Sequence, residues 1–166
     1  MQEEKREVAP NRYPILNTYV NALSMDETVD YVKRVIARRT PPVQHVVINA
    51  LKVNLMEKDP ELREIVNSCP LINADGASIL WAAKKLGVPV TERVTGIDLF
   101  MRLVEEAAKN GYKIYLFGAK PEVVEKVREY LEGLNIFEEI LITRAGGVIS
   151  SHCGPGTLGI LFILGG

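Results

Sequence analysis

Short β-branched runs alternate with amphipathic helical segments along this chain, and that alternation restricts the fold more than any other feature. Val43–Asn49 is a compact run of the kind that forms a buried parallel strand. Leu71–Asn73 and Lys113–Phe117 predict two further strands, and Tyr13–Tyr19 predicts a first one. The pattern therefore predicts an α/β fold, with a mainly parallel, Rossmann-like sheet and helices on both of its faces.

The predicted helices have recognisable start and stop residues. Ser24–Glu27 reads as a capping box that opens a helix ending near Arg38 and Arg39. Asp59 followed by Pro60 places a capping carboxylate and a first-turn proline at another helix start. The spacing of apolar residues predicts the remaining helices from about residue 51, over 77–86, over 96–109 and from 121 to 131.

The length of 166 residues suits one domain. We expect residues 1–12 to be a flexible lead-in and residues 13–166 to form a single α/β domain. Within it, residues 13–134 form the body, and residues 135–166 form an atypical tail whose Gly-rich sequence supplies the final strands.

Composition argues against several classes of protein. Twenty basic side chains nearly balance twenty-one acidic ones, which gives no case for nucleic-acid binding. The charged N-terminus lacks a secretory signal, and the longest apolar run, Leu158–Leu164, is too short to cross a bilayer. With only two cysteines, these features predict a cytoplasmic protein. A cluster of basic residues has two possible roles: it contacts the inner face of an anionic membrane, or it complements the C-terminus of a helix. The cluster consists of Lys33, Arg34, Arg38 and Arg39.

Two motifs in the tail lack the context that their chemistry needs. His152-Cys153 would need further metal ligands, and His45 is the only other histidine, so no metal site is predicted. Gly154–Gly159 matches the dinucleotide-binding pattern G-x-G-x-x-G, but only seven residues follow it, which leaves no room for the required helix.

Ligands of open α/β sheets bind beyond the carboxyl ends of the strands, a rule that selects Asn49, Asp75 and the turn Gly118-Ala119-Lys120. Asp75 stands at a strand-to-helix junction, where a carboxylate serves either as a helix cap or as a functional group. The turn at Gly118 is either a plain tight connection or a phosphate-binding loop at a helix N-terminus. Arg93, close to a glycine turn, is either a diphosphate clamp or a surface ion-pair partner.

Three runs, in this order, resemble a known family of bacterial transferases: Asn73–Gly76, Glu92–Leu99 and Leu116–Pro121. That family adds N-acetylmannosamine, or its uronic acid, in the synthesis of wall teichoic acid and enterobacterial common antigen. The resemblance covers roughly residues 14–134. It implies transfer from a uridine diphosphate sugar to N-acetylglucosamine on an undecaprenyl diphosphate, without a metal or another cofactor, and it leaves self-association open.

The resemblance also assigns roles to individual residues. Asp75 matches the carboxylate proposed as general base, which takes the proton of the attacking acceptor hydroxyl. Asn49 and Arg93 match pocket residues that hold the sugar or the diphosphate. The stretch formed by Gly118, Ala119 and Lys120 matches one that lies at the nucleotide.

The chain departs from the family pattern in two places. Val47 stands where the family usually has a threonine, so a hydroxyl that would contact the sugar is missing. The family's C-terminal region, which completes the site and meets the membrane, is not recognisable in this sequence, so weak or absent transfer is expected.

Residues 139–162 instead resemble the closing segment of DegV-type fatty-acid-binding proteins, or share Gly-rich turn chemistry with it by convergence. The chain thus reads as a splice of two α/β proteins, natural or engineered. The alternatives to a transferase are a lipid-binding module and a recombined fold without activity.

Overall fold

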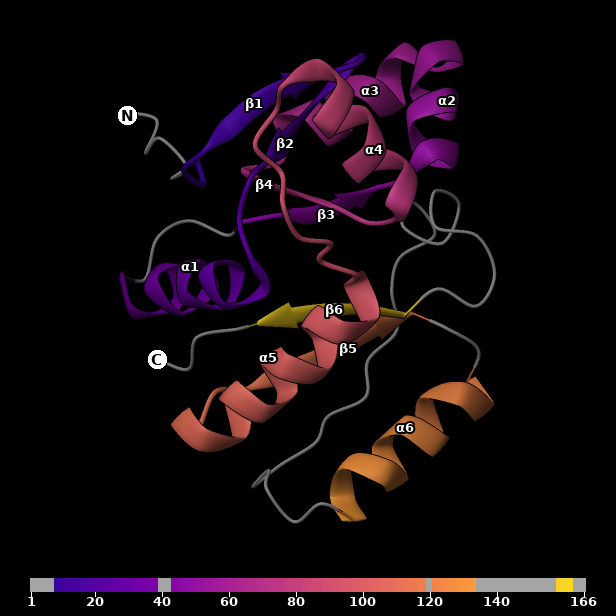
Figure 1. Ribbon diagram of the computed structural model, residues 1–166. Helices are drawn as coiled ribbons and strands as arrows, with labels where there is room; N and C mark the ends of the chain where they lie inside the picture. Colours follow the sequence, from indigo (N-terminus) through magenta and orange to yellow (C-terminus); the bar gives the residue numbers. More distant parts are fainter. Residues whose placement is uncertain (1–7, 39–42, 119–120, 134–157, 163–166) are drawn as a thin grey trace, which may run out of the picture. The chain divides into compact units, whose positions relative to one another are not determined.

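The computed structural model describes residues 8–38, 43–118, 121–133 and 158–162, and for residues 115–118 and 158–162 it describes the backbone alone. The chain divides into two compact units, Met1–Leu99 and Phe100–Gly166. Strands and helices alternate through both units, which confirms the predicted α/β class (Figure 1).

The first unit begins with an antiparallel hairpin of β1 (Arg12–Ile15) and β2 (Thr18–Asn21). Its later strands, β3 (His45–Ile48) and β4 (Leu71–Ala74), pair in parallel. The helices of this unit are α1 (Met25–Arg38), α2 (Ala50–Lys58), α3 (Pro60–Ser68), α4 (Ala77–Leu86) and the first turn of α5 (Gly96–Asn110).

The hairpin replaces the single strand predicted over Tyr13–Tyr19. Ile15 pairs with Thr18, so Leu16 and Asn17 form a two-residue turn, and Leu16 has a positive φ of 53°. A leucine in this conformation gives no turn signal in the sequence, because glycine, asparagine and aspartate are the usual residues there. The turn is fastened by the Asn17 amide, which donates to the Val53 carbonyl at 3.2 Å.

Side chains of β4 alternate between two hydrophobic clusters, so helices cover both faces of the parallel pair. Ile72 and Ala74 join Ile48 in a cluster packed by α2, α3, α4 and the hairpin. Leu71 packs instead with Tyr31 of α1, which lies on the opposite side of β3 from α2 and α4 (Figure 1). Helices on both faces are therefore confirmed for this pair. One continuous, mainly parallel sheet stays a prediction, because the described strands form three separate pairs.

Two helix starts have the capping chemistry that the sequence predicts. At α1, Ser24 Oγ accepts the Glu27 N–H at 3.1 Å, and Glu27 Oε2 accepts the Ser24 N–H at 2.7 Å. At α3, Asp59 Oδ1 accepts the Leu62 N–H at 2.9 Å, with Pro60 at the first helical position. These three hydrogen bonds satisfy N–H groups that the helices themselves leave without a partner.

A hydrogen-bond network runs from β3 through β4 to α1. Asn73 Nδ2 donates to Thr28 Oγ1 at 3.1 Å, and Asn73 Oδ1 lies 3.0 Å from His45 Nε2. Since that amide oxygen only accepts, the neutral imidazole carries its proton on Nε2. Burial lowers the pKa of His45 to about 4, against a smaller rise from the Asn73 hydrogen bond, and the charge of Lys52 lowers it further.

Acidification is expected to destabilise the wild-type protein more than a His45→Gln variant. Between pH 6.5 and about 4, the unfolded chain protonates His45 while the folded chain keeps it neutral, so stability is lost as the pH falls. The two proteins should differ by about 2 to 3 kcal/mol in their loss of unfolding free energy. Urea unfolding at neutral pH and in mild acid measures this loss. Equal losses would show that His45 is not the titrating group, because the carboxylates titrate in both proteins.

The second unit contains the rest of α5, β5 (Ile114–Gly118), α6 (Pro121–Gly133) and β6 (Leu158–Phe162). β6 runs antiparallel to β5, from Leu158 opposite Gly118 to Phe162 opposite Ile114. β6 is thus a strand contributed by the tail. The rest of the predicted tail, with the His152-Cys153 pair and most of the DegV-like segment, lies outside the described residues.

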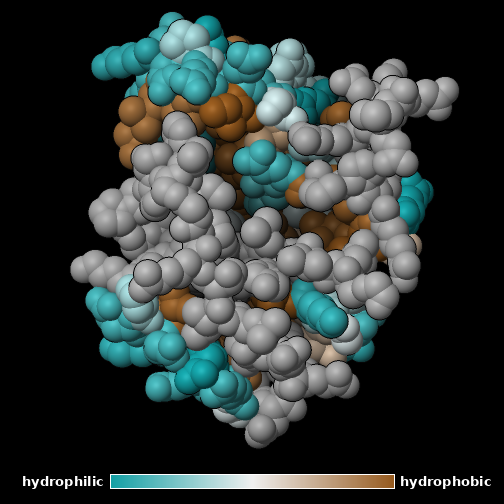
Figure 2. Space-filling model, turned by 180° about the vertical axis from the view of Figure 1, so that it is seen from behind, coloured by the Kyte–Doolittle hydropathy of each residue, from teal (hydrophilic) through white to brown (hydrophobic). Residues whose placement is uncertain are grey.

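Large apolar side chains remain exposed on helices of the first unit. Leu51 of α2 is 68% exposed and Trp81 of α4 is 66% exposed. Figure 2 shows hydrophobic surface patches among hydrophilic ones on the face that is turned away in Figure 1. Within the described ranges, no helix has the combination of length and apolarity that crossing a membrane requires.

Candidate functional site

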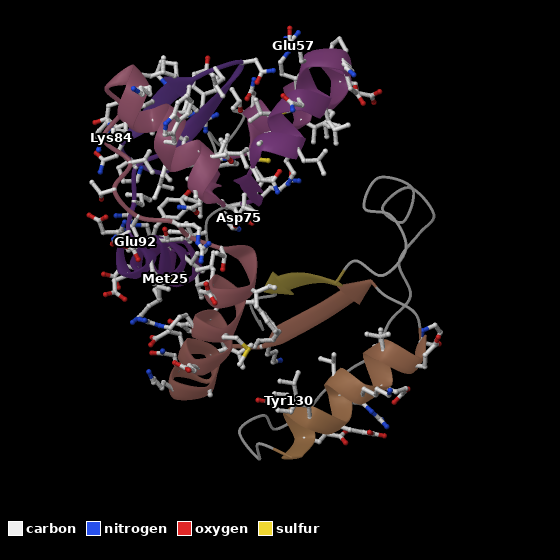
Figure 3. All side chains as sticks on the ribbon, turned by 45° about the vertical axis from the view of Figure 1, so that its right-hand side comes forward. Met25, Glu57, Asp75, Lys84, Glu92 and Tyr130 are labelled. Atoms are coloured by element: carbon white, nitrogen blue, oxygen red, sulfur yellow. The ribbon has the colours of Figure 1, made fainter. Side chains whose placement is uncertain are left out.

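The carboxyl edge of the β3–β4 pair brings Asn49 and Asp75 together. Ile48 and Ala74 form the last pair of the two strands, so the residues that follow lie at the same edge. The Asp75 N–H donates to the Ile48 carbonyl at 2.8 Å, which extends the pairing by one step. Figure 3 shows Asp75 at this position, beside the starts of α2 and α4. Both residues thus follow strand ends at one edge, and their contact with a ligand stays a prediction.

Asp75 does not cap the helix that follows it. Gly76 is the N-cap residue of α4, and no side chain accepts a hydrogen bond there. Gly76 adopts φ 117° and ψ 148°, a region open essentially to glycine alone. Among the described residues, the partly buried Asp75 carboxylate has no hydrogen-bond or ion-pair partner. Of the two alternatives that the sequence left open, the helix cap is therefore excluded.

Asn49 does act as a helix cap, through its amide oxygen. Its Oδ1 atom accepts the Lys52 N–H at 2.9 Å at the start of α2. Lys52 Nζ in turn donates to the Val47 carbonyl at 2.8 Å. The cap uses only the oxygen of the amide, so the NH₂ group of Asn49 retains its capacity to donate to a ligand.

Arg93 belongs to the loop that connects α4 to α5. The next residue, Val94, has a fully buried side chain, and its N–H donates to the Ala74 carbonyl at 2.9 Å. Arg93 itself is exposed. The loop therefore places the backbone of Arg93 next to the strand end that carries Asp75.

Three helices, α2, α4 and α5, begin at this edge. The start of α5 lies over β3, where a Cβ added to Gly96 would stand 3.9 Å from Cγ2 of Val47. Thr95 caps α5: its Oγ1 accepts the Asp98 N–H at 3.1 Å and lies 2.6 Å from Asp98 Oδ2. Helix N-termini present N–H donors and the positive ends of helix dipoles, so an edge with three of them favours an anionic ligand.

The turn predicted to lie at the nucleotide belongs to the second unit. Gly118 ends β5 in the second unit, and Ala119 and Lys120 lie outside the described residues. Their contact with a nucleotide therefore stays a prediction.

The sequence analysis assigned no role to three residues of the loop and helix start near this edge. Thr95 and Asp98 have the Thr-x-x-Asp spacing of a capping pair, which was legible in the sequence. Glu92 is different, because its Oε2 atom accepts the Met25 N–H at 3.2 Å from a residue 67 positions away. No local pattern indicates a contact of that range.

Residues 13–146 match the model of the glycosyl transferase family WecG/TagA/CpsF. The matched stretch contains Asn49, Asp75, Arg93 and the turn at Gly118. It also continues beyond residue 134, where the motif resemblance ends.

Proposed function

This chain belongs to the WecG/TagA/CpsF glycosyl transferase family, and from that premise we propose that it transfers N-acetylmannosamine, or its uronic acid. The proposed donor is a uridine diphosphate sugar, and the proposed acceptor is N-acetylglucosamine on a lipid diphosphate at the inner face of a membrane. One observation carries this proposal. The Asp75 carboxylate caps no helix, and it lies at an edge where the Arg93 loop and three helix N-termini meet.

In the proposed reaction, the acceptor hydroxyl oxygen forms a bond to the anomeric carbon of the donor sugar. The bond between that carbon and the diphosphate oxygen breaks, and the diphosphate leaves with the bonding electrons. Asp75 takes the proton of the attacking hydroxyl. Arg93 and the starts of α2, α4 and α5 stabilise the charge that develops on the leaving group. The NH₂ group of Asn49 donates to the sugar.

One observation favours the lipid-binding alternative. A groove of about 600 Å³ lies between α5 and α6, lined mainly by apolar side chains such as Phe100, Val104, Val127 and Leu131. This volume lies within the range of small-molecule pockets, so the groove is where a fatty acid would bind if the tail resemblance described the function.

A calorimetric titration with uridine diphosphate and, separately, with palmitate tests the two functions. We expect uridine diphosphate to bind and Arg93→Ala to weaken it by about 10- to 100-fold, the cost of losing a charged hydrogen bond. Arg63→Ala is the matched control, because it removes an arginine from α3, which leads to the opposite end of β4. Binding of palmitate without binding of uridine diphosphate would refute the transferase proposal.

A further inference from the structure

Glu92 links the Arg93 loop to the start of α1. The Met25 N–H, at the first position of that helix, donates to Glu92 Oε2 at 3.2 Å (Figure 3). The capping box of Ser24 and Glu27 engages other N–H groups of the same helix end, so Glu92 supplies the acceptor that Met25 needs. This acceptor comes from a distant loop, and the contact is therefore tertiary as well as capping.

Arg93 consequently stands between two fixed neighbours. On one side Glu92 is fastened to α1, and on the other Val94 is hydrogen-bonded to Ala74 and fully buried. Consecutive Cα atoms are only about 3.8 Å apart, so fixing both neighbours leaves the Arg93 backbone little room to move. An exposed loop would otherwise have to be ordered when a ligand binds, which weakens binding.

The same contact controls where the negative charge of Glu92 lies. A carboxylate next to Arg93 in sequence could pair with its guanidinium or repel an incoming diphosphate. The positive end of the α1 dipole stabilises that carboxylate at the helix start instead. Because Glu92 is engaged at the start of α1, its carboxylate competes less for the Arg93 guanidinium.

We propose that Glu92 is a positioning residue, which fixes Arg93 for diphosphate binding through its hydrogen bond to the Met25 N–H. The inference rests on the proposed role of Arg93 and goes beyond it, because it assigns the loop's order to one tertiary contact.

Calorimetric titration with uridine diphosphate tests the proposal on the full chain. Glu92→Ala should weaken binding by about two- to tenfold, the cost of ordering one long side chain on binding. Glu92→Gln should bind like the wild type, because its amide oxygen still accepts the Met25 N–H. Glu61→Ala, which removes a first-turn carboxylate from α3, is the matched control and should leave binding unchanged.

A double variant, Glu92→Ala with Arg93→Ala, separates positioning from an independent effect. If Glu92 acts through Arg93, the double variant should bind no more weakly than Arg93→Ala alone. Additive losses, or unchanged binding by Glu92→Ala where Arg93→Ala is weakened, would overturn the positioning role and leave the proposed function standing. Unchanged binding by Arg93→Ala would instead refute the role of Arg93, and the role of Glu92 with it.

Discussion

Replacement of Asp75 by asparagine is expected to lower the rate of sugar transfer by about 10² to 10⁴-fold, the loss that follows removal of a positioned base. Asparagine has nearly the same shape but cannot take the proton of the acceptor hydroxyl. Stability should change by less than about 0.5 kcal/mol, because Asp75 caps no helix and pairs with no described side chain. Product formation from the nucleotide sugar and a lipid-diphosphate acceptor measures the rate, and a thermal melt measures the fold.

Asp59→Asn provides the matched control for this variant. Asp59 caps α3 through its Oδ1 atom, and asparagine caps a helix about as well as aspartate does. The same chemical change at a structural carboxylate should therefore leave transfer unaffected. Wild-type turnover by Asp75→Asn would show that Asp75 is not the base, and an equal loss in both variants would point to a general effect on the protein.

Local side-chain chemistry could be predicted from the sequence where the signal and its target lie within a few residues. The box formed by Ser24 and Glu27, and the cap formed by Asp59, both involve contacts over three positions. The turn at Leu16 could not be predicted in the same way. Its conformation is maintained by Asn17 and by the packing of the hairpin on the rest of the unit, and neither leaves a local pattern.

The same distinction between local and long-range signals applies to the candidate site. Asn49 and Asp75 could be placed at one edge because parallel strands end together, and strand ends can be read from the sequence. Whether Asp75 was a cap could not be decided, since that depends on the backbone of Gly76. The tie between Glu92 and Met25 depends on how two distant segments pack, which no single-sequence pattern records.

Removal of the last nine residues, from Leu158 onward, is expected to destabilise the second unit by about 3 to 5 kcal/mol. Among the described residues, β5 pairs with β6 and with no other strand. Each backbone hydrogen bond of a ladder contributes about 1 kcal/mol, and this pairing extends over the whole of β5. An unpaired β5 edge would also promote association between chains. Urea unfolding followed by circular dichroism measures the loss, and light scattering measures the association.

A second truncation that keeps β6 and removes only residues 163–166 controls for shortening the chain. It should retain most of the stability, because all five residue pairs of the β5–β6 ladder remain. The comparison assigns the loss to strand pairing rather than to chain length, and amide hydrogen exchange of residues 114–118 should rise only in the longer truncation. Equal stability of the two truncated proteins would mean that β6 contributes nothing to the second unit. In that case the pairing of β6 with β5 would not stabilise this unit.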